Sequence, residues 1–332
     1  MSGGPRSFED LTEFGRARRL RPLAMKALES YDVEVSRLRL ITNSWNCVFR
    51  VDTTDGTRFA LRVTLPRPER HRSLVGAEVD FMAALAAGTE LTVPMPVMNV
   101  DGDPVTEACA EGVPQPRDCV LFSWVTGRDL AEAVTPDSYC RLGEVMATMH
   151  DFASAWAPPP DFPLMTYDAT IHLGESMVLL DDHAMRLYSR EHRKIAALLL
   201  AKSDVNVAAA HRRGMAIVTH GDMHHWNVKV DRGQFAVIDF EDLQFATPVL
   251  DVATTLYYIR WRDDYAQLFE GYRAGYSSVR PWVEAFDGEL EGLIPARGLD
   301  LLNVCIDSPE LDMDLTEFSA RIWNRCADLL GR

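Results

Sequence analysis

The sequence predicts an α+β protein of two lobes, a small antiparallel sheet followed by a larger, mainly helical region. Three observations predict this class. A strand–turn–strand pattern surrounds residue 55, helical spacing of apolar residues prevails beyond Gly127, and one β segment at 216–240 interrupts the helices. We therefore expect an N-terminal lobe over 1–125 and a helical C-terminal lobe over 126–332.

In the first lobe, Asp55-Gly56 supplies the turn of a hairpin, because this dipeptide favours the backbone of tight turns. Apolar residues at helical spacing then predict a helix that ends at Gly88. The expected strands are 48–51, 58–63, 93–98 and 119–122, and the expected helix is about 73–87.

In the second lobe, apolar residues recur at helical spacing over most of the chain. The expected helices include one that ends at His150 and others at 177–200, 250–262 and 315–330. Pro158, Pro159 and Pro160 exclude regular structure after the first of these helices.

The composition is that of a folded protein. Of 332 residues, 47% are hydrophobic and 25% are charged, with a net charge of −15. The apolar content excludes a disordered chain, and the acidic balance argues against nucleic acid as a partner. No apolar run approaches the roughly 18 to 20 residues needed to cross a bilayer, and the N-terminus lacks a signal-peptide core. We expect a cytoplasmic protein without a membrane partner; the sequence does not predict its oligomeric state.

The β segment at 216–240 carries the candidate chemistry. An apolar strand leads into His220-Gly221-Asp222, and two further short strands end at Asp239. Strand ends hold side chains rigidly, so that Asp222, Asn227 and Asp239 can converge on one point. Carboxylate and amide oxygens are ligands suited to Mg²⁺ that carries the phosphates of a nucleotide. Phosphoryl transfer needs little else beyond a group that orients the attacking hydroxyl.

Two other interpretations of this segment stay open. His220-Gly221-Asp222 can form a plain turn between strands. His220, His224 and His225 can be zinc ligands, although a spacing of four presents two imidazoles to one ion only on a helix, and here a strand ends.

The pattern H-G-D-x-x-x-x-N at 220–227, followed by Ile238-Asp239-Phe240, resembles the aminoglycoside phosphotransferase and homoserine kinase group of small-molecule kinases. The resemblance implies a bilobal protein-kinase-like fold. It also implies that Asp222 is the catalytic base, that His220 supports the loop, and that Asn227 and Asp239 hold Mg²⁺. Asp251 resembles the later aspartate that braces the catalytic loop in this family.

The resemblance extends into the first lobe and implies a nucleotide site there. Arg62 matches the residue that grips phosphate, with Glu78 as its ion-pair partner, and Arg62 with Glu78 can equally be a plain surface ion pair. The segment with Asn46 lies where a phosphate-covering loop is expected, although it lacks glycine. The segment with Phe122 and Trp124 resembles the hinge that binds adenine through its backbone.

Two further groups of residues carry alternatives. Glu241 and Asp242 follow the expected metal ligand and either meet the substrate or are solvated loop acids. The aromatic residues Tyr257, Tyr258, Trp261 and Tyr265 lie at helical spacing, which is more typical of a core than of a cofactor site.

These observations favour a kinase that uses ATP and Mg²⁺ to phosphorylate a hydroxyl of a small molecule. The acceptor would be an amino-acid-like or amino-alcohol metabolite, or an aminoglycoside-type antibiotic, because the acidic chain favours a cationic substrate. The alternatives are a protein Ser/Thr kinase of the stress-response type and a non-catalytic nucleotide-binding scaffold.

Overall fold

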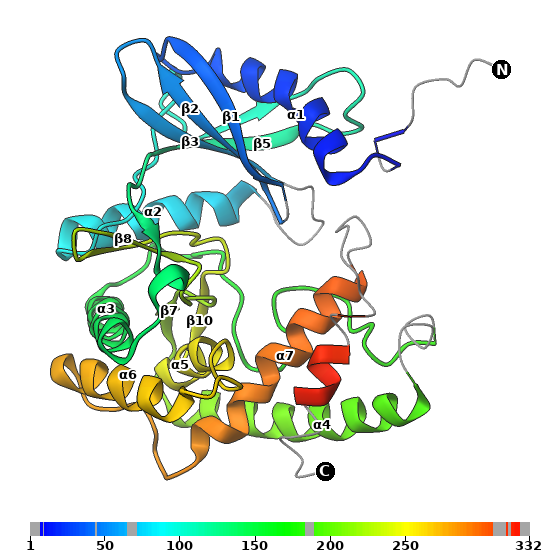
Figure 1. The fold of residues 1–332 in the computed structure, drawn as a ribbon, viewed down its shortest axis with the longest axis vertical. Coiled ribbons are helices and arrows are strands. Elements are labelled where there is room, and N and C mark those ends of the chain that lie inside the picture. Colours follow the sequence, from blue (N-terminus) through cyan, green and yellow to red (C-terminus); the bar gives the residue numbers. More distant parts are fainter. Residues whose placement is uncertain are drawn as a thin grey trace. The chain divides into compact units, whose positions relative to one another are not determined.

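The computed structural model describes residues 7, 8, 10–43, 45–64, 72–182, 189–307, 317 and 320–325. The chain divides into two compact units. Unit 1 consists mainly of Met1–Ala83 and Pro94–Val125, and unit 2 mainly of Ala84–Val93 and Thr126–Pro309. Strands prevail in the first unit and helices in the second (Figure 1), as the sequence predicts for an α+β protein.

Unit 1 is built on an antiparallel sheet of five strands in the order β1-β2-β3-β5-β4. Along β2, fully and partly buried residues alternate, because successive side chains of a strand point to opposite faces. Helix α1 contributes Leu20 and Leu23 to the same apolar core as Phe49 and Leu61 of the sheet. The elements are α1 (Glu13–Leu28), β1 (Val35–Asn43), β2 (Cys47–Thr53), β3 (Arg58–Val63), α2 (Arg72–Gly88), β4 (Val105–Ala108) and β5 (Arg117–Ser123); the end of α2, from Ala84, belongs to unit 2.

The turn between β2 and β3 has the chemistry that Asp55-Gly56 predicts. Gly56 has a φ of +87°, which glycine adopts at little cost. The Asp55 carboxylate accepts hydrogen bonds from the Thr57 backbone N–H at 2.9 Å and from the Thr53 hydroxyl at 2.5 Å. The hairpin expected from the sequence is confirmed.

Unit 2 combines helices with two small antiparallel sheets, in which β7 pairs with β10 and β8 lies between β6 and β9. Its strands are β6 (Arg128–Asp129), β7 (Ile217–Thr219), β8 (Val228–Asp231), β9 (Gln234–Val237) and β10 (Gln244–Ala246). Its helices are the 3-10 turn η1 (Leu130–Ala133), α3 (Pro136–Ala155), α4 (Arg190–Arg213), α5 (Pro248–Tyr257), α6 (Tyr265–Val279) and α7 (Glu289–Asp307).

Close helix packing forms the core of unit 2. A Cβ atom at Gly143 or Gly275 would collide with backbone carbonyls of Tyr272 and Cys140, so α3 and α6 approach each other closely. Helix α7 is buried along most of its length and packs against α4 and α5. Its buried residues include the polar Arg297, Asp300 and Asn303 as well as apolar side chains.

The helix expected at 177–200 is wrong in its position. Helix α4 begins only at Arg190, where the Ser189 hydroxyl accepts the backbone N–H of His192. Upstream, the backbone N–H groups of Val178 and Leu179 donate to the Asn303 side chain of α7, in a segment that forms no helix. Residues 183–188 of the expected helix lie outside the described residues.

Other element predictions are also corrected. The expected strand at 93–98 forms only an isolated bridge at Pro96, because Pro94 and Pro96 lack the N–H that a sheet needs. The helix expected at 250–262 ends at Tyr257, where shorter-range backbone hydrogen bonds tighten the chain. Helix α1 and strand β1 were not expected. Of the helix expected at 315–330, residue 317 and residues 320–325 are helical, and the rest lies outside the described residues.

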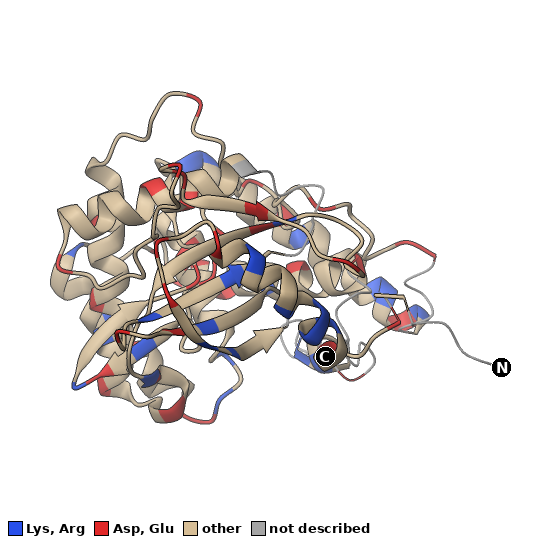
Figure 2. Cartoon of the chain, turned by 90° about the horizontal axis from the view of Figure 1, so that it is seen from above, with Lys and Arg blue, Asp and Glu red and all other residues tan. Residues whose placement is uncertain are grey.

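The acidic residues are spread over helices, strands and loops (Figure 2), so the negative charge is not concentrated in one segment. Within the described part of the chain, no helix combines the length and apolar character that a membrane span requires.

Candidate active site

The loop at 220–227 connects the end of β7 with the start of β8. Gly221 has a φ of +79°, and a Cβ atom there would collide with the carbonyl oxygen of Asp242. Only glycine combines this backbone conformation with such a close approach. The backbone conformation and the close packing together explain why a glycine lies between His220 and Asp222.

Asp251, in the first turn of α5, holds the start of this loop. Its carboxylate accepts the backbone N–H groups of His220 at 3.2 Å and Gly221 at 3.0 Å. The same carboxylate lies 2.9 Å from Nε2 of His150, which comes from α3. Asp251 and His150 are fully buried. A buried carboxylate with several donors is a rigid support, because losing any donor leaves charge unsatisfied.

His220 supports the loop from inside. Its Nε2 donates to the carbonyl oxygen of Ile238 at 3.2 Å, while Nδ1 accepts the backbone N–H of Asp222 at 3.3 Å. Burial lowers the pKa of His220 below its ordinary value, which agrees with a neutral ring that both donates and accepts. These contacts place His220 behind Asp222 as a structural support.

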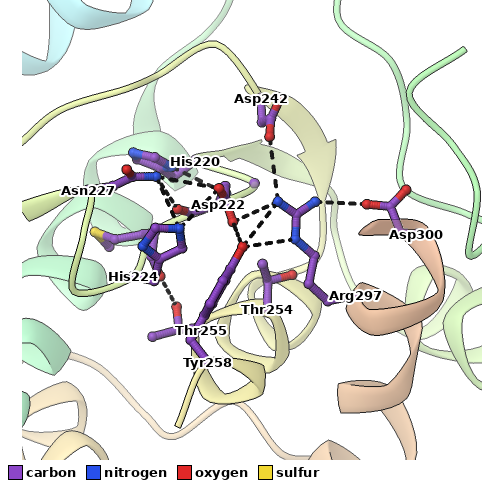
Figure 3. A network of polar contacts seen from close by, with 12 residues as sticks. His220, Asp222, His224, Asn227, Asp242, Thr254, Thr255, Tyr258, Arg297 and Asp300 are labelled. Carbon is purple, nitrogen blue, oxygen red and sulfur yellow. Dashed lines mark hydrogen bonds and ion pairs between the residues drawn. The ribbon is translucent and has the colours of Figure 1, made fainter. Parts of the chain in front are cut away.

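The Asp222 carboxylate is the centre of a polar network drawn from several elements (Figure 3). Oδ1 accepts the hydroxyl of Tyr258 at 2.6 Å and lies 2.8 Å from Nη2 of Arg297. Oδ2 lies 3.3 Å from Nε2 of His224 and 3.4 Å from the amide nitrogen of Asn227. Oδ1 therefore has the two shorter contacts, and Oδ2 has the two longer ones.

The electrostatics of this network favour the ionised form of Asp222. Burial acts to raise the pKa of the carboxyl, but the charge of Arg297, together with His224 and the Tyr258 hydroxyl, outweighs burial and holds the pKa well below its ordinary value. Farther out, burial raises the pKa of Asp300 to about 6, and it also raises the pKa of Glu175, with the charge of Asp300 as a further cause. Arg297 is thus the central cation among several acids.

Asn227 and Asp239 suit the oxygen-rich metal site predicted from the sequence. The backbone N–H of Ile238 donates to the backbone carbonyl of Asn227 at 2.9 Å, and Asp239 is the residue directly after Ile238. The amide nitrogen of Asn227 donates to the Asp222 carbonyl at 2.9 Å, which leaves the amide oxygen as its donor atom for a cation. Asp239 is exposed and has a φ of +66°, a rare conformation for a residue other than glycine. An amide and a carboxylate oxygen fit Mg²⁺.

The three histidines of the loop use their ring nitrogens in separate hydrogen bonds. His220 faces Ile238, His224 faces Asp222, and Nδ1 of His225 lies 2.7 Å from the Tyr139 hydroxyl. Among the described residues, no group of three or more His, Cys, Asp or Glu side chains is arranged to hold a metal ion. The geometry therefore gives no support to the zinc interpretation.

In unit 1, Arg62 of β3 and Glu78 of α2 form a two-pronged ion pair, with N–O distances of 2.8 and 2.5 Å. Their side chains are 8% and 5% exposed, so the pair is buried and is not the plain surface ion pair that was the alternative. The guanidinium of Arg62 also lies 5.3 Å from the ring centre of Phe122. Asn46, in the segment between β1 and β2, is buried. Trp124 lies under Arg50, 5.5 Å from its guanidinium carbon.

Of the two acids considered for substrate binding, Asp242 is placed near the network. Its Oδ2 lies 3.8 Å from Nη2 of Arg297. Glu241 is half-buried beside it in the chain. Their contact with a substrate stays a prediction.

Sequence reasoning missed two residues that touch Asp222 directly, Tyr258 and Arg297. Tyr258 was grouped with a core aromatic cluster, whereas its hydroxyl binds the Asp222 carboxylate. Arg297 follows Pro295 in a segment for which no element was expected. The helix expected at 250–262 includes Tyr258 and gives no sign of this contact, and no local signal in the sequence points to Arg297.

The chain is similar to a known protein family and to several solved structures. A model of the phosphotransferase enzyme family matches residues 38–282. Among solved structures, the chain is similar to a microcompartment-associated aminopropanol kinase, with 22% identity, a TM-score of 0.73, and coverage of 93% of this chain and 94% of that chain. It is also similar to the amicoumacin kinase hAmiN in complex with AMP-PNP, Ca²⁺ and Ami, with 16% identity, a TM-score of 0.74 and 96% of each chain covered.

A thermostable mutant of the aminoglycoside phosphotransferase APH(4)-Ia is 17% identical, with a TM-score of 0.61 and coverage of 90% of this chain and 94% of that chain. The search among curated proteins finds no match. The expected protein-kinase-like fold, an antiparallel-sheet lobe with a helical lobe, is confirmed by these likenesses. Because the family model matches well over half of the 332 residues, the chain belongs to the phosphotransferase enzyme family, and the enzyme class expected from its sequence is confirmed.

Proposed function

We propose that the protein transfers the γ-phosphoryl group of ATP, in the presence of Mg²⁺, to a hydroxyl group of a small molecule. The observation that carries this proposal is the Asp222 carboxylate, held at the end of β7 and kept ionised by Arg297. The Asn227 side chain binds to its backbone, and Asp239 follows on the neighbouring hairpin. Together they supply what phosphoryl transfer requires of the protein, which is orientation and electrostatics.

In this proposal, Asp222 orients the acceptor hydroxyl by accepting its hydrogen bond. A carboxylate whose pKa is held low is a weak base, yet it suffices, because phosphoryl transfer through a loose transition state needs little nucleophilic push. His220 and Asp251 keep the loop in place through their contacts with its backbone. The loop therefore works as a preorganised support rather than as a mobile base.

The donor side is proposed from the chemistry of the residues. Asn227 and Asp239 would hold Mg²⁺, which when bound neutralises charge on the phosphates. Arg62, fixed by Glu78, would hold a phosphate oxygen. Asn46, Phe122 and Trp124 stay proposed nucleotide-binding residues.

For the acceptor we propose a hydroxyl compound that also carries an amine, such as an amino alcohol, an amino-acid-like metabolite or an aminoglycoside-type antibiotic. Asp242 and Asp300 lie around the single guanidinium of Arg297, and Glu175 interacts electrostatically with Asp300. This excess of acids favours a cationic ligand. The names of two similar structures, aminopropanol kinase and aminoglycoside phosphotransferase, support the same class.

The test is ATP consumption by the purified protein with Mg²⁺ and a panel of amino alcohols, hydroxyl amino acids, aminoglycosides, nucleosides and sugars. Asp222→Asn should lower kcat by about 10³-fold with little change in ATP affinity, because the contact matters mainly in the transition state. Asp263→Asn, the same change at an exposed turn, is the control and should behave as the wild type does.

The outcomes separate the alternatives. Turnover that depends on one acceptor and is lost in Asp222→Asn supports the proposal and identifies the acceptor class. Transfer to a protein acceptor, without turnover on the panel, favours a protein Ser/Thr kinase. Binding of ATP without transfer to any acceptor favours a non-catalytic nucleotide-binding scaffold, and failure to bind Mg²⁺ and ATP overturns the proposal.

A further inference from the structure

Arg297 is a buried arginine, 8% exposed, that connects Asp222 to α7 (Figure 3). Its Nη2 lies 2.8 Å from Oδ1 of Asp222 and its Nη1 lies 2.8 Å from Oδ2 of Asp300, one turn farther along the same helix. Its Nε and Nη2 are each 3.4 Å from the Tyr258 hydroxyl. The planar guanidinium is thereby fixed at several points, as a flexible ammonium would not be.

Tyr258 also binds Oδ1 of Asp222, the oxygen that Arg297 contacts. Its hydroxyl donates to Oδ1 at 2.6 Å, a short hydrogen bond of the kind that forms when the acceptor is charged. Tyr258 caps the end of α5, the helix whose first turn carries Asp251. Oδ1 thus receives two strong donors from α5 and α7, neither of which belongs to the catalytic loop.

The second oxygen of Asp222 is held much less firmly. Its two neighbours, Nε2 of His224 and the amide nitrogen of Asn227, lie at 3.3 and 3.4 Å, near the outer limit for hydrogen bonds. An oxygen with long contacts can accept a further donor at low cost. The carboxylate therefore has an anchored oxygen and one that is open to a hydroxyl.

We propose that Arg297, with Tyr258, is a positioning residue: by holding Oδ1 of Asp222, it presents Oδ2 to the acceptor hydroxyl. This inference rests on the proposed function. It assigns to α7, about 75 residues beyond the catalytic loop, a part in the geometry of the reaction. Asp300 acts behind Arg297 and fixes the other end of the guanidinium.

A purely structural role would have other consequences. If Arg297 only balanced buried acids, replacing it would reduce stability without changing kcat per folded molecule. Arg260 provides a matched control, because its Nε lies 2.9 Å from Glu291 and joins the segment after α5 to the same helix α7. Arg260 is part-exposed and forms this ion pair away from the Asp222 carboxylate.

The experiment compares wild type, Arg297→Met, Arg297→Lys, Tyr258→Phe and Arg260→Met by steady-state kinetics and by crystal structures. For Arg297→Met we expect a kcat about 100-fold lower with the KM for ATP unchanged, and an Asp222 carboxylate turned from its wild-type orientation. Arg297→Lys should have a kcat about tenfold higher than that of Arg297→Met, since lysine restores the charge but not the planar guanidinium. Tyr258→Phe should lose about tenfold in kcat, and Arg260→Met should resemble the wild type.

Two results would overturn the inference. One is a wild-type kcat in both Arg297→Met and Tyr258→Phe; the other is an unchanged Asp222 orientation in the structure of Arg297→Met. If Arg297→Met does not fold, Tyr258→Phe, which removes one oxygen atom only, decides by the same two readouts. A wild type that consumes no ATP with any acceptor overturns the proposed function, while the orientation of Asp222 in the crystals still decides the positioning role.

Discussion

Two buried arginines of this enzyme bind carboxylates in contrasting ways. In unit 1, both terminal nitrogens of Arg62 bind the two oxygens of Glu78 in one closed pair. In unit 2, Arg297 divides its nitrogens between Asp222 and Asp300 and has Asp242 at 3.8 Å. A closed pair fixes one arginine in place, whereas a shared arginine couples several acids to one another.

Charges are balanced in the pair of Arg62 and Glu78, whereas negative charges are in excess around Arg297. Each member of the closed pair compensates the desolvation of the other, so removal of either leaves a buried charge. Around Arg297 the acids outnumber the nearby cation, and burial already raises the pKa of Asp300 to about 6. Loss of a carboxylate should therefore greatly reduce stability at the Arg62–Glu78 pair, whereas the protein should tolerate the loss of one around Arg297.

The largest stability effect is expected from Glu78→Ala. It removes a counter-charge from the buried guanidinium of Arg62 and should lower the free energy of unfolding by about 3 to 5 kcal/mol. Urea unfolding followed by circular dichroism measures this change. The double variant Arg62→Met/Glu78→Leu, which leaves no charge unpaired, should lose much less stability while its kinase activity is still abolished. A fully active double variant would remove Arg62 from the proposed nucleotide site.

A smaller effect, with a characteristic pH dependence, is expected from Asp300→Asn. The raised pKa of Asp300 means that the folded protein binds a proton at this carboxyl more tightly than the unfolded chain does. The stability contributed by the protonated carboxyl is therefore fully present below about pH 4 and is lost as the pH rises through about 6. Asparagine cannot ionise. From pH 4 to pH 7, Asp300→Asn should therefore gain about 2 kcal/mol in unfolding free energy relative to wild type.

Unfolding curves at several pH values, with Asp263→Asn as an exposed control, measure this difference. A constant offset between Asp300→Asn and wild type across the range would contradict the contrast between the two arginines, since Asp300 would then ionise as an ordinary carboxyl does.

The smallest effect is expected at an exposed arginine. Arg262 binds Asp264 with N–O distances of 2.8 and 2.9 Å, geometry as good as that of the buried pairs, but both side chains are about 40% exposed. Arg262→Ala should change the unfolding free energy by about 0.5 kcal/mol or less, because water solvates the remaining carboxylate. A loss comparable to that of Glu78→Ala would show that hydrogen-bond geometry, rather than burial, sets the strength of these pairs.

Much of the candidate catalytic loop at 220–227 could be predicted because its signals are local. His220, Gly221, Asp222 and Asn227 lie within eight residues, and a strand precedes and follows them. The hairpin at Asp55-Gly56 was predictable for the same reason. The pair of Arg62 and Glu78 was identified only through the resemblance to a family, since a strand and a helix had to be brought together.

The elements that were missed depend on distant partners. The segment around Val178 looks helical in sequence, but it forms no helix, and its backbone N–H groups bind the Asn303 side chain of α7. Helix α7 has acidic residues in its first turn, Glu289 and Glu291, but it contains Pro295 and is buried on most sides, so it lacks an amphipathic stripe. A helix without such a stripe is recognised mainly from what surrounds it.

The sequence by itself determined the fold class, the loop at 220–227 and the oxygen-bearing side chains proposed to hold Mg²⁺, because strand ends, turn residues and short spacings act over a few residues. Only the tertiary structure decided how Asp222 is held. Arg297 and Tyr258 reach it from α7 and from the end of α5, and the pKa of a carboxyl depends on every charge and on the burial around it rather than on its neighbours in the chain.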